Sequence, residues 1–154
     1  MRSCKTHFAS AFIALFVATT PAKADICSIY RSVVKGDFTG ARDALVTFGS
    51  VFRDGDCWAD DEEFECDRTF TSQEVKNRFD TVEHAAIGKD IAESIARPCG
   101  LKVAKPKLVE NTGSYFPNSY IYVFAIRFSE MEPINVQIER SGDGASVLVY
   151  YEPR

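Results

Sequence analysis

Four cysteines and a dense run of acidic residues are the features of this sequence that could do chemistry. The cysteines are Cys27, Cys57, Cys66 and Cys99, and a fifth, Cys4, lies in an N-terminal segment considered below. Their spacings include no C-x₂₋₄-C pair, which disfavours a zinc site. In an oxidising compartment four cysteines form two disulfides, with three possible connectivities. We expect Cys57–Cys66, which closes a short loop, and Cys27–Cys99, which ties the start of the domain to the end of a helical segment.

Eight of the fourteen residues from 54 to 67 are acidic, and the only tryptophan lies among them. The simplest interpretation is a solvated loop that keeps the protein soluble. A second is an anionic docking surface for a protein with a basic surface. A disulfide would hold such a loop in one shape although its charges repel one another. Because the loop would already be ordered, it would lose less entropy on binding. Its negative potential would also speed association with a basic partner. The residues that would then contact the partner are Trp58, Asp60, Asp61, Glu62, Glu63 and Glu65.

A third interpretation of the same segment is a Ca²⁺ site, because hard cations prefer clustered oxygen ligands. Asp54-Gly55-Asp56 begins like an EF-hand loop and Glu65 falls at its twelfth position, but Trp58 and Ala59 replace a ligand and the glycine that the loop needs. We therefore expect neither a metal ion nor another cofactor. A tryptophan in a small domain is also more often a core residue than a binding anchor, so both positions stay open for Trp58.

The sequence contains no recognisable catalytic motif. His84 is the only histidine after residue 24, which excludes multi-histidine metal sites. There is no G-x-S-x-G turn, no glycine-rich phosphate loop and no dinucleotide fingerprint. Two carboxylates could act as an acid–base pair, but with 22 acidic residues the sequence cannot nominate them. We therefore name no catalytic residue and expect a binding protein rather than an enzyme.

The first 24 residues predict export. Arg2 and Lys5 precede an apolar run from Phe8 to Ala18, which is followed by Ala22-Lys23-Ala24, the order of a signal peptide and its cleavage site. The run is too short for a membrane span, which needs about 20 apolar residues. We therefore expect a signal peptide over residues 1–24 and one periplasmic or secreted domain over residues 25–154.

Charge limits the partners of that domain. Removing residues 1–24 takes away three of the 18 basic residues and no acid, so 15 basic and 22 acidic residues leave a formal charge of −7. Such a charge argues against nucleic acid, which is bound by neutralising phosphates with Lys and Arg. It suits a partner with a basic surface.

Helices are predicted in the first two thirds of the domain. Apolar residues recur at helical spacing from Ile26 to Val34, and Gly36 ends that helix. Asp37 or Thr39 caps a second helix, although residues 44–52 could instead form a buried strand. Thr71 and Glu74 have the spacing of a capping box, which starts a helix that Pro98 ends and that Gly88 could bend.

The last third predicts strands, at 107–110, 119–128, 134–140 and 146–152, because β-branched and aromatic residues dominate there. Residues 141–144, Ser-Gly-Asp-Gly, predict a hairpin turn. Ile134, Val136 and Ile138 alternate with polar residues, so that strand should have one solvated face. The fold class is therefore α+β, with N-terminal helices packed on one face of a C-terminal antiparallel sheet of about four strands and two disulfides.

These observations together predict an exported, non-enzymatic binding protein that acts on a basic partner through the acidic disulfide loop, as an inhibitor or immunity-type protein would. The alternative is a small-molecule binding or enzymatic domain with a pocket between helices and sheet. A deep cavity containing His84, Arg127 or several tyrosines would favour the alternative. A packed core with a projecting acidic loop would favour the protein-binding function.

Overall fold

The computed structural model describes residues 25–49, 51–110 and 120–153, so the predicted signal peptide lies outside the described residues. The helices are α1 (Ser28–Val34), α2 (Phe38–Phe48), α3 (Ser72–Arg78), α4 (His84–Ala96) and a 3₁₀ turn η1 (Arg97–Cys99). The strands are β1 (Asp56–Ala59), β2 (Phe64–Phe70), β3 (Lys107–Glu110), β4 (Tyr120–Ile126), β5 (Ile134–Ser141) and β6 (Gly144–Tyr151). The α+β class is confirmed.

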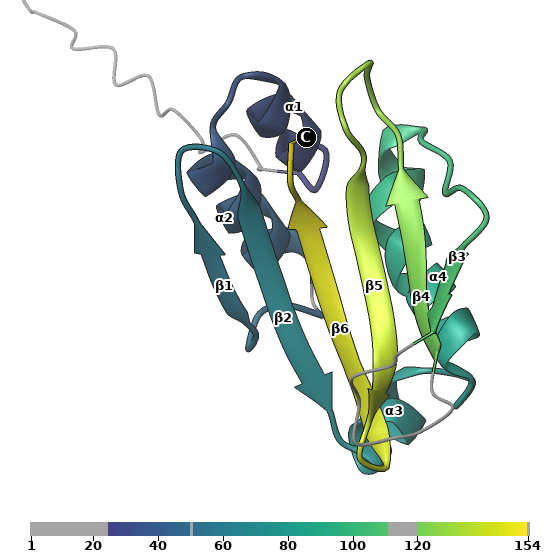
Figure 1. The fold of residues 1–154 in the computed structure, drawn as a ribbon. Coiled ribbons are helices and arrows are strands. Elements are labelled where there is room, and N and C mark those ends of the chain that lie inside the picture. Colours follow the sequence, from purple (N-terminus) through teal and green to yellow (C-terminus); the bar gives the residue numbers. More distant parts are fainter. Residues whose placement is uncertain (1–24, 50, 111–119, 154) are drawn as a thin grey trace, which may run out of the picture.

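The strands form one antiparallel sheet in the order β1-β2-β6-β5-β4-β3 (Figure 1). The prediction of about four strands is wrong, because the acidic cysteine segment is itself a hairpin, β1–β2, that adds two strands beside β6. Alternation in β2 explains this: Phe64, Cys66 and Phe70 are buried, whereas Glu65 and Asp67 between them are half-exposed. The high charge of the segment obscured a period-2 pattern that is typical of a strand with one solvated face.

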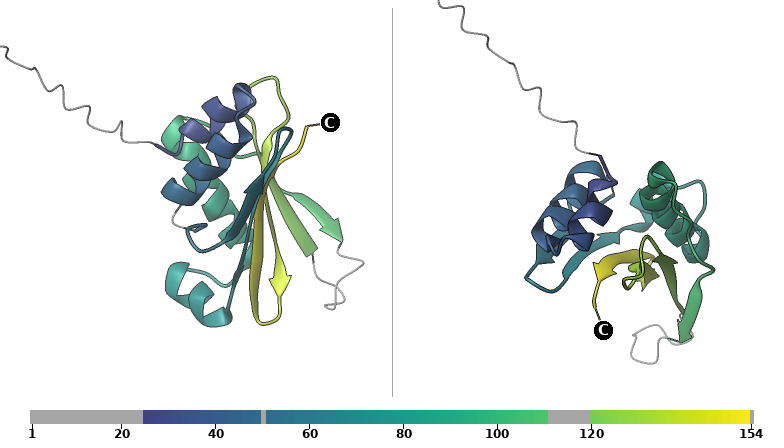
Figure 2. Two further views of the ribbon diagram at one scale, coloured as in Figure 1. Left: turned by 90° about the vertical axis from the view of Figure 1, so that its left-hand side faces the viewer. Right: turned by 90° about the horizontal axis from the view of Figure 1, so that it is seen from above.

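The helices lie on one side of the sheet (Figures 1 and 2). α2 packs on β1 and β2, α4 on β4 and β5, and α3 on β6 and β2, while α1 packs on α2. In the two views of Figure 2 the β3–β4 edge of the sheet turns away from the helices, toward the other side. We call that other side, which carries no helix of the described chain, the open face.

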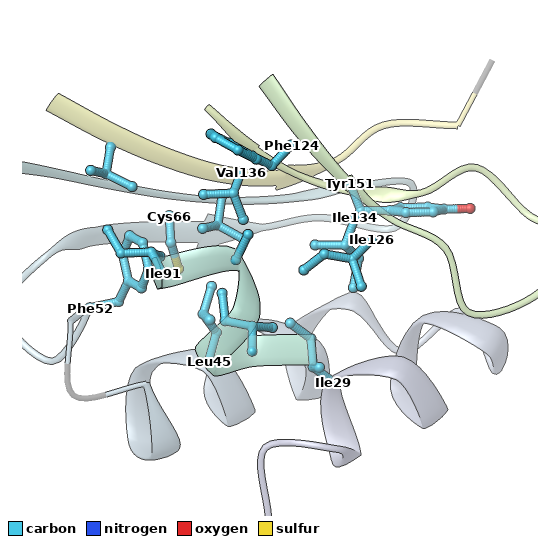
Figure 3. Close-up of a cluster of buried hydrophobic side chains, with 14 of the residues drawn as sticks. Ile29, Leu45, Phe52, Cys66, Ile91, Phe124, Ile126, Ile134, Val136 and Tyr151 are labelled. Carbon is cyan, nitrogen blue, oxygen red and sulfur yellow. The ribbon is translucent and has the colours of Figure 1, made fainter. Parts of the chain in front are cut away.

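The space between helices and sheet is filled by apolar side chains (Figure 3). Ile29, Leu45, Phe52, Ile126 and Val136 are among those with no exposed surface. Burying one such side chain contributes roughly 1.5–3 kcal/mol relative to leaving it exposed. The core therefore holds helices and strands together and leaves the open face as the solvated side of the sheet.

Two polar caps set where the helices begin. The Asp37 carboxylate accepts a hydrogen bond from the backbone N–H of Gly40 at 2.8 Å, which confirms one of the two predicted caps of α2. Thr71 and Glu74 form the predicted capping box of α3. Residues 44–48 belong to helix α2, so this part of the segment is not the buried strand that was the alternative. Phe52 is buried in the turn that follows.

The single long helix predicted to start at Thr71 is two helices. The break lies at residues 79–83, and Gly88 sits inside α4 rather than at a bend. Phe79 leaves the helical path and its ring packs edge-on against that of Phe70 at 5.7 Å. Burial of this aromatic ring thus redirects the chain between α3 and α4.

Both predicted disulfides are present. Cys27–Cys99 has Cα atoms 5.5 Å apart and joins the start of α1 to the end of η1. Tyr30 strengthens the same junction, since its hydroxyl donates to the Ile95 carbonyl at 2.8 Å. Burial raises the pKa of this tyrosine, so the hydroxyl remains a donor. No helix in the described ranges is both long and apolar enough to cross a membrane.

Candidate functional site

The acidic segment forms a hairpin fixed by its own disulfide. β1 and β2 pair with Asp56 opposite Asp67 and Cys57 opposite Cys66. The two cysteines form the second bridge, with Cα atoms 4.1 Å apart. That spacing is just below the usual range for disulfides but is close to the distance between directly opposed residues of an antiparallel pair. The bridge therefore spans neighbouring strands and holds the register of the hairpin.

Residues 60–63, four consecutive acids, form the turn of this hairpin. The carboxylate of Asp60 accepts from the backbone N–H groups of Glu62 and Glu63 at 2.8 and 3.0 Å. These two hydrogen bonds lower the pKa of Asp60 because they stabilise the charged form. The turn therefore uses the side-chain oxygen of one of its own acids to hold its shape.

The pKa of Glu63 is shifted in the opposite direction from that of Asp60. Burial raises its pKa, and the negative charges of Asp60, Glu152, Glu65 and Glu62 raise it further. Glu152 directly follows β6, so the carboxylates of the turn and of the chain beyond β6 act on one another. The negative field of the turn thus extends onto the sheet.

Strand alternation places the other acids of the hairpin on the open face. Asp56 pairs with Asp67, which pairs with Leu148 of β6. Directly paired residues point to the same side of a sheet. Thr69 pairs with Ser146, which pairs with Glu139 of β5, so a further acid joins that side. The strand acids on the open face are Asp56, Glu65, Asp67 and Glu139.

Among the described strand residues on this face, Lys107 of β3 is the one basic side chain. Its partner Val123 pairs with Gln137, and Gln137 pairs with Leu148, which fixes its side of the sheet. The buried cation Arg68 points the other way. We define the acidic face as the turn 60–63 together with Asp56, Glu65, Asp67 and Glu139. Its negative charge is concentrated on the open face of the sheet.

Trp58 lies within the acidic face. Its side is fixed by pairing, since Trp58 opposes Glu65 and Glu65 opposes Tyr150. It is 43% exposed, so the core position that residue type alone favours is wrong. In β1 the residues that point to the helices are Cys57 and Ala59, which are small enough to fit against α2. An exposed tryptophan beside acidic side chains is typical of a residue that anchors a protein interface.

The structure brings all six predicted partner-binding residues together on one hairpin. Sequence reasoning missed the acids Asp56, Asp67 and Glu139 and the half-buried Tyr150 as neighbours of that hairpin. Asp67 and Glu139 are 72 residues apart in sequence and lie on the two strands that flank β6. No local pattern signals that they share one face of the sheet.

Arg68 anchors the other end of the hairpin to the helices. Its guanidinium is 7% exposed and donates to the Val51 carbonyl at 2.8 Å. It also pairs with the carboxylates of Asp54 and Glu74, at 3.5 and 3.3 Å, and covers the ring of Phe70. Burying a charge is costly unless it is paired and hydrogen-bonded, and Arg68 meets both conditions. This cluster is structural and ties β2 to α3 and to the segment before β1.

The spacing that resembles an EF-hand loop does not fold as one. Residues 56–59 are extended in β1, so the acids alternate along a strand instead of surrounding one point. Within residues 25–49, 51–110 and 120–153, no group of three His, Cys, Asp or Glu side chains is placed to hold a metal ion.

His84 lies in a separate hollow at the opposite end of the sheet from the acidic turn, next to Ser72 and Asp143. These residue types could form a catalytic triad, but their hydrogen bonds are not those of a triad, in which the histidine lies between the serine and the aspartate. The Ser72 hydroxyl donates directly to Asp143 at 2.8 Å, and Nε2 of His84 lies 3.1 Å from the Gly144 carbonyl. This arrangement ties α3 and α4 to the β5–β6 turn and does not aim a base at the serine.

A second hollow, of about 460 Å³, lies on the open face beside the acidic face. It is lined by residues of β3, β4, β5 and β6 and of the loops around them, including Lys107, Val123, Gln137, Tyr150 and Glu152. Burial and the negative charge of Glu152 raise the pKa of Tyr150. Its phenol therefore stays protonated and available as a donor near neutral pH.

Comparison with known protein families, with curated proteins and with solved structures finds no match for this chain. Function must therefore be argued from the site.

Proposed function

We propose that this is an exported, non-enzymatic binding protein whose acidic face docks a second protein with a basic surface. It would act as inhibitors and immunity proteins do, by covering that surface. One observation carries the proposal: acids from β1, β2, β5 and the turn 60–63 share one side of the sheet with an exposed tryptophan. Negative potential concentrated on one face speeds encounter with a positive partner.

The rigidity of the hairpin supports docking over a merely solvated surface. The bridge between Cys57 and Cys66, the hydrogen bonds to the Asp60 carboxylate and the Arg68 cluster hold both ends of the hairpin. A surface that is already ordered loses less entropy when it binds. Solubility alone does not require these restraints, because the same acids on a mobile loop would keep the protein soluble equally well.

The disulfides support export. Two bridges persist in an oxidising compartment and are rare in reducing ones. Together with the signal-peptide pattern of residues 1–24, they favour a periplasmic or secreted location.

The alternative, a pocket between helices and sheet, has less support. That layer is packed with buried side chains, and Arg127 and Tyr120 are exposed to solvent. His84 lies at one end of the sheet with its ring nitrogen on a backbone carbonyl. The packed core and the projecting hairpin are the combination that favours protein binding.

The experiment compares the protein with two variants as bait for periplasmic and secreted proteins of the source organism. The hairpin variant carries Asp60→Asn, Asp61→Asn, Glu62→Gln and Glu63→Gln, and Asn at position 60 keeps an oxygen for the turn. The control variant removes the same charge from exposed positions of the helical side, by Asp43→Asn, Asp80→Asn, Glu83→Gln and Asp90→Asn.

We expect a basic protein that wild type and the control variant retain at low salt and that the hairpin variant loses. With that protein in hand, the hairpin variant should lower the association rate, and Trp58→Ala should raise the dissociation rate. Equal retention by wild type and the hairpin variant would show that the acidic face is only a solvated surface.

A further inference from the structure

We infer that the hollow on the open face receives a basic side chain, lysine or arginine, projected by the partner. This inference rests on the proposed function and specifies how the partner is recognised. The acidic face supplies attraction at long range, and the hollow would supply a defined contact. The hollow is lined from four strands and, at about 460 Å³, falls in the size range of small-ligand pockets.

The walls of the hollow suit an alkyl stem. Val109, Ile121 and Val123 lie on the open-face side of β3 and β4, and Pro133 adds a further apolar surface. Lysine and arginine bury their methylene stems against such surfaces while their charged ends remain among polar groups. Figure 2 shows that the β3–β4 edge curls away from the helices, and residues of both strands line the hollow.

The charges of the hollow suit a cationic end group. Glu132 precedes β5 and Glu152 follows β6, and because Asn135 pairs with Tyr150 these two acids lie at the same end of the hollow. Lys107 lies two residue pairs further along the sheet, at the β3 edge. The end of the hollow that carries Glu132 and Glu152 is therefore negatively charged.

The same end connects the hollow to the acidic face. Glu65 of the acidic face pairs with Tyr150, and Tyr150 and Glu152 both line the hollow. In keeping with this placement, the pKa of Glu63 is raised by burial and further by the charge of Glu152. A cation drawn to the turn would pass this carboxylate on entering the hollow. The tyrosine ring and the amide oxygens of Asn135 and Gln137 provide further favourable contacts for a cation.

The test uses n-butylguanidinium as an isolated arginine end group, with n-butylammonium as its lysine counterpart. Binding is followed by NMR through the side-chain amides of Asn135 and Gln137 and the ring of Tyr150, which report on the hollow directly. Butyrate and n-butanol, with the same alkyl stem, are the anionic and neutral comparisons. Two variants alter the hollow, Glu132→Gln with Glu152→Gln to remove its charge and Val123→Phe to fill it.

We expect both cations to shift these signals and the two comparison compounds to shift them far less. The double Gln variant should weaken binding about fivefold in total, since ion pairs that remain accessible to solvent contribute only modestly. Val123→Phe should abolish binding without unfolding the protein, as its remaining NMR spectrum will show. The hairpin variant should bind the probes nearly as well as wild type.

Shifts spread evenly over the acidic face and unchanged in the double Gln and Val123→Phe variants would overturn the inference. That outcome would leave the proposed function intact if the bait experiment still depends on the hairpin acids. Specific binding of the cations with no hairpin-dependent protein partner would instead retain the hollow and reject the proposed function.

Discussion

At the scale of single residues, Gly88 shows how closely α4 approaches the sheet. A Cβ atom at this position would lie 2.5 Å from Cγ2 of Ile138 and 2.6 Å from Cε2 of Phe124. These side chains are buried, so they cannot move aside cheaply. The glycine is required by packing against two strands and not by a bend in its helix.

Gly88→Ala should therefore destabilise the protein, although alanine is the better helix former by about 1 kcal/mol. Overpacking of a core costs about 1–3 kcal/mol, and we expect a net loss within that range in urea unfolding. Asp90→Ala, on the exposed side of the same helix, is the control for helix propensity and should leave stability unchanged or slightly raised. Equal stability of Gly88→Ala and wild type would mean that the helix sits further from the sheet.

Glu74 gives a pH-dependent prediction. Hydrogen bonds from the backbone and side chain of Thr71, and then Arg68, lower its pKa below the ordinary value of 4.5. A lowered pKa contributes stability that is present above the unfolded value and is lost as pH falls through the folded value. Glu74→Gln keeps an acceptor for the capping box but loses the charge.

Glu74→Gln should therefore unfold more readily than wild type near neutral pH, and the two proteins should converge as the pH falls below the ordinary value of 4.5 and through the lowered pKa of Glu74. Urea unfolding at a series of pH values measures this difference. Glu130→Gln, at an exposed position, controls for the removal of one carboxylate. A difference that is independent of pH would assign the role of Glu74 to hydrogen-bond geometry alone.

At the scale of elements, the two disulfides should differ in their contributions. In the chain-entropy model the stabilisation grows with the loop that is closed. The sequence separations are 72 for Cys27–Cys99 and 9 for Cys57–Cys66. Replacing both cysteines by alanine should cost about 4 kcal/mol for the first bridge and about 2–3 kcal/mol for the second.

Denaturant unfolding of the two double-alanine variants checks this order. The hairpin bridge should matter more for binding, because its loss frees the acidic turn, and the Cys27–Cys99 bridge more for folding. A larger loss of stability from the hairpin bridge would contradict the entropic account. Cavity formation at the fully buried Cys66 would then be the stronger effect.

The elements also show what the sequence could and could not predict. Thr71 with Glu74, Asp37, the turn at residues 141–144 and the alternation of Ile134, Val136 and Ile138 are local signals, and the structure confirms them. The strands β1 and β2 were missed because acidic residues have low strand propensity, and tertiary pairing with β6 overrides that preference. The helix break at 79–83 depends on a contact with Phe70, which no local pattern reports.

The candidate site was predictable to a similar extent. The residues of the hairpin and its bridge could be named from composition and cysteine spacing alone. Their side of the sheet, and the exposure of Trp58, depend on which face the helices cover. That choice follows from the small size of Cys57 and Ala59 against α2, a fact of packing rather than of sequence order.

At the scale of the whole molecule, charge and packing are separated by the sheet. The apolar core lies on the helical side of the sheet and the acids of the hairpin lie on the open face, so like charges repel across β1, β2 and the turn. At 0.1 M salt the Debye length is about 10 Å, so added salt weakens the repulsion between exposed charges. The melting temperature of wild type should therefore rise with moderate NaCl, and that of the hairpin variant should rise less.

Calorimetry at low and moderate NaCl measures this difference. The control variant with four charges removed from the helical side should respond to salt as wild type does. An equal response of all three proteins would mean that the acids are too far apart to repel.

The central position of β6 has a consequence for how the chain acquires its structure. β6 lies between β2 and β5, yet it is the last strand in sequence, so the two halves of the sheet cannot be joined until residues 144–151 have been synthesised. Until then the β1–β2 hairpin lacks its main partner, and an isolated hairpin is marginally stable. A chain that emerges from its N-terminus therefore stays incompletely folded until residues 144–151 appear. Such a delay would suit the export proposed above, in which the chain crosses a membrane unfolded and folds on the far side.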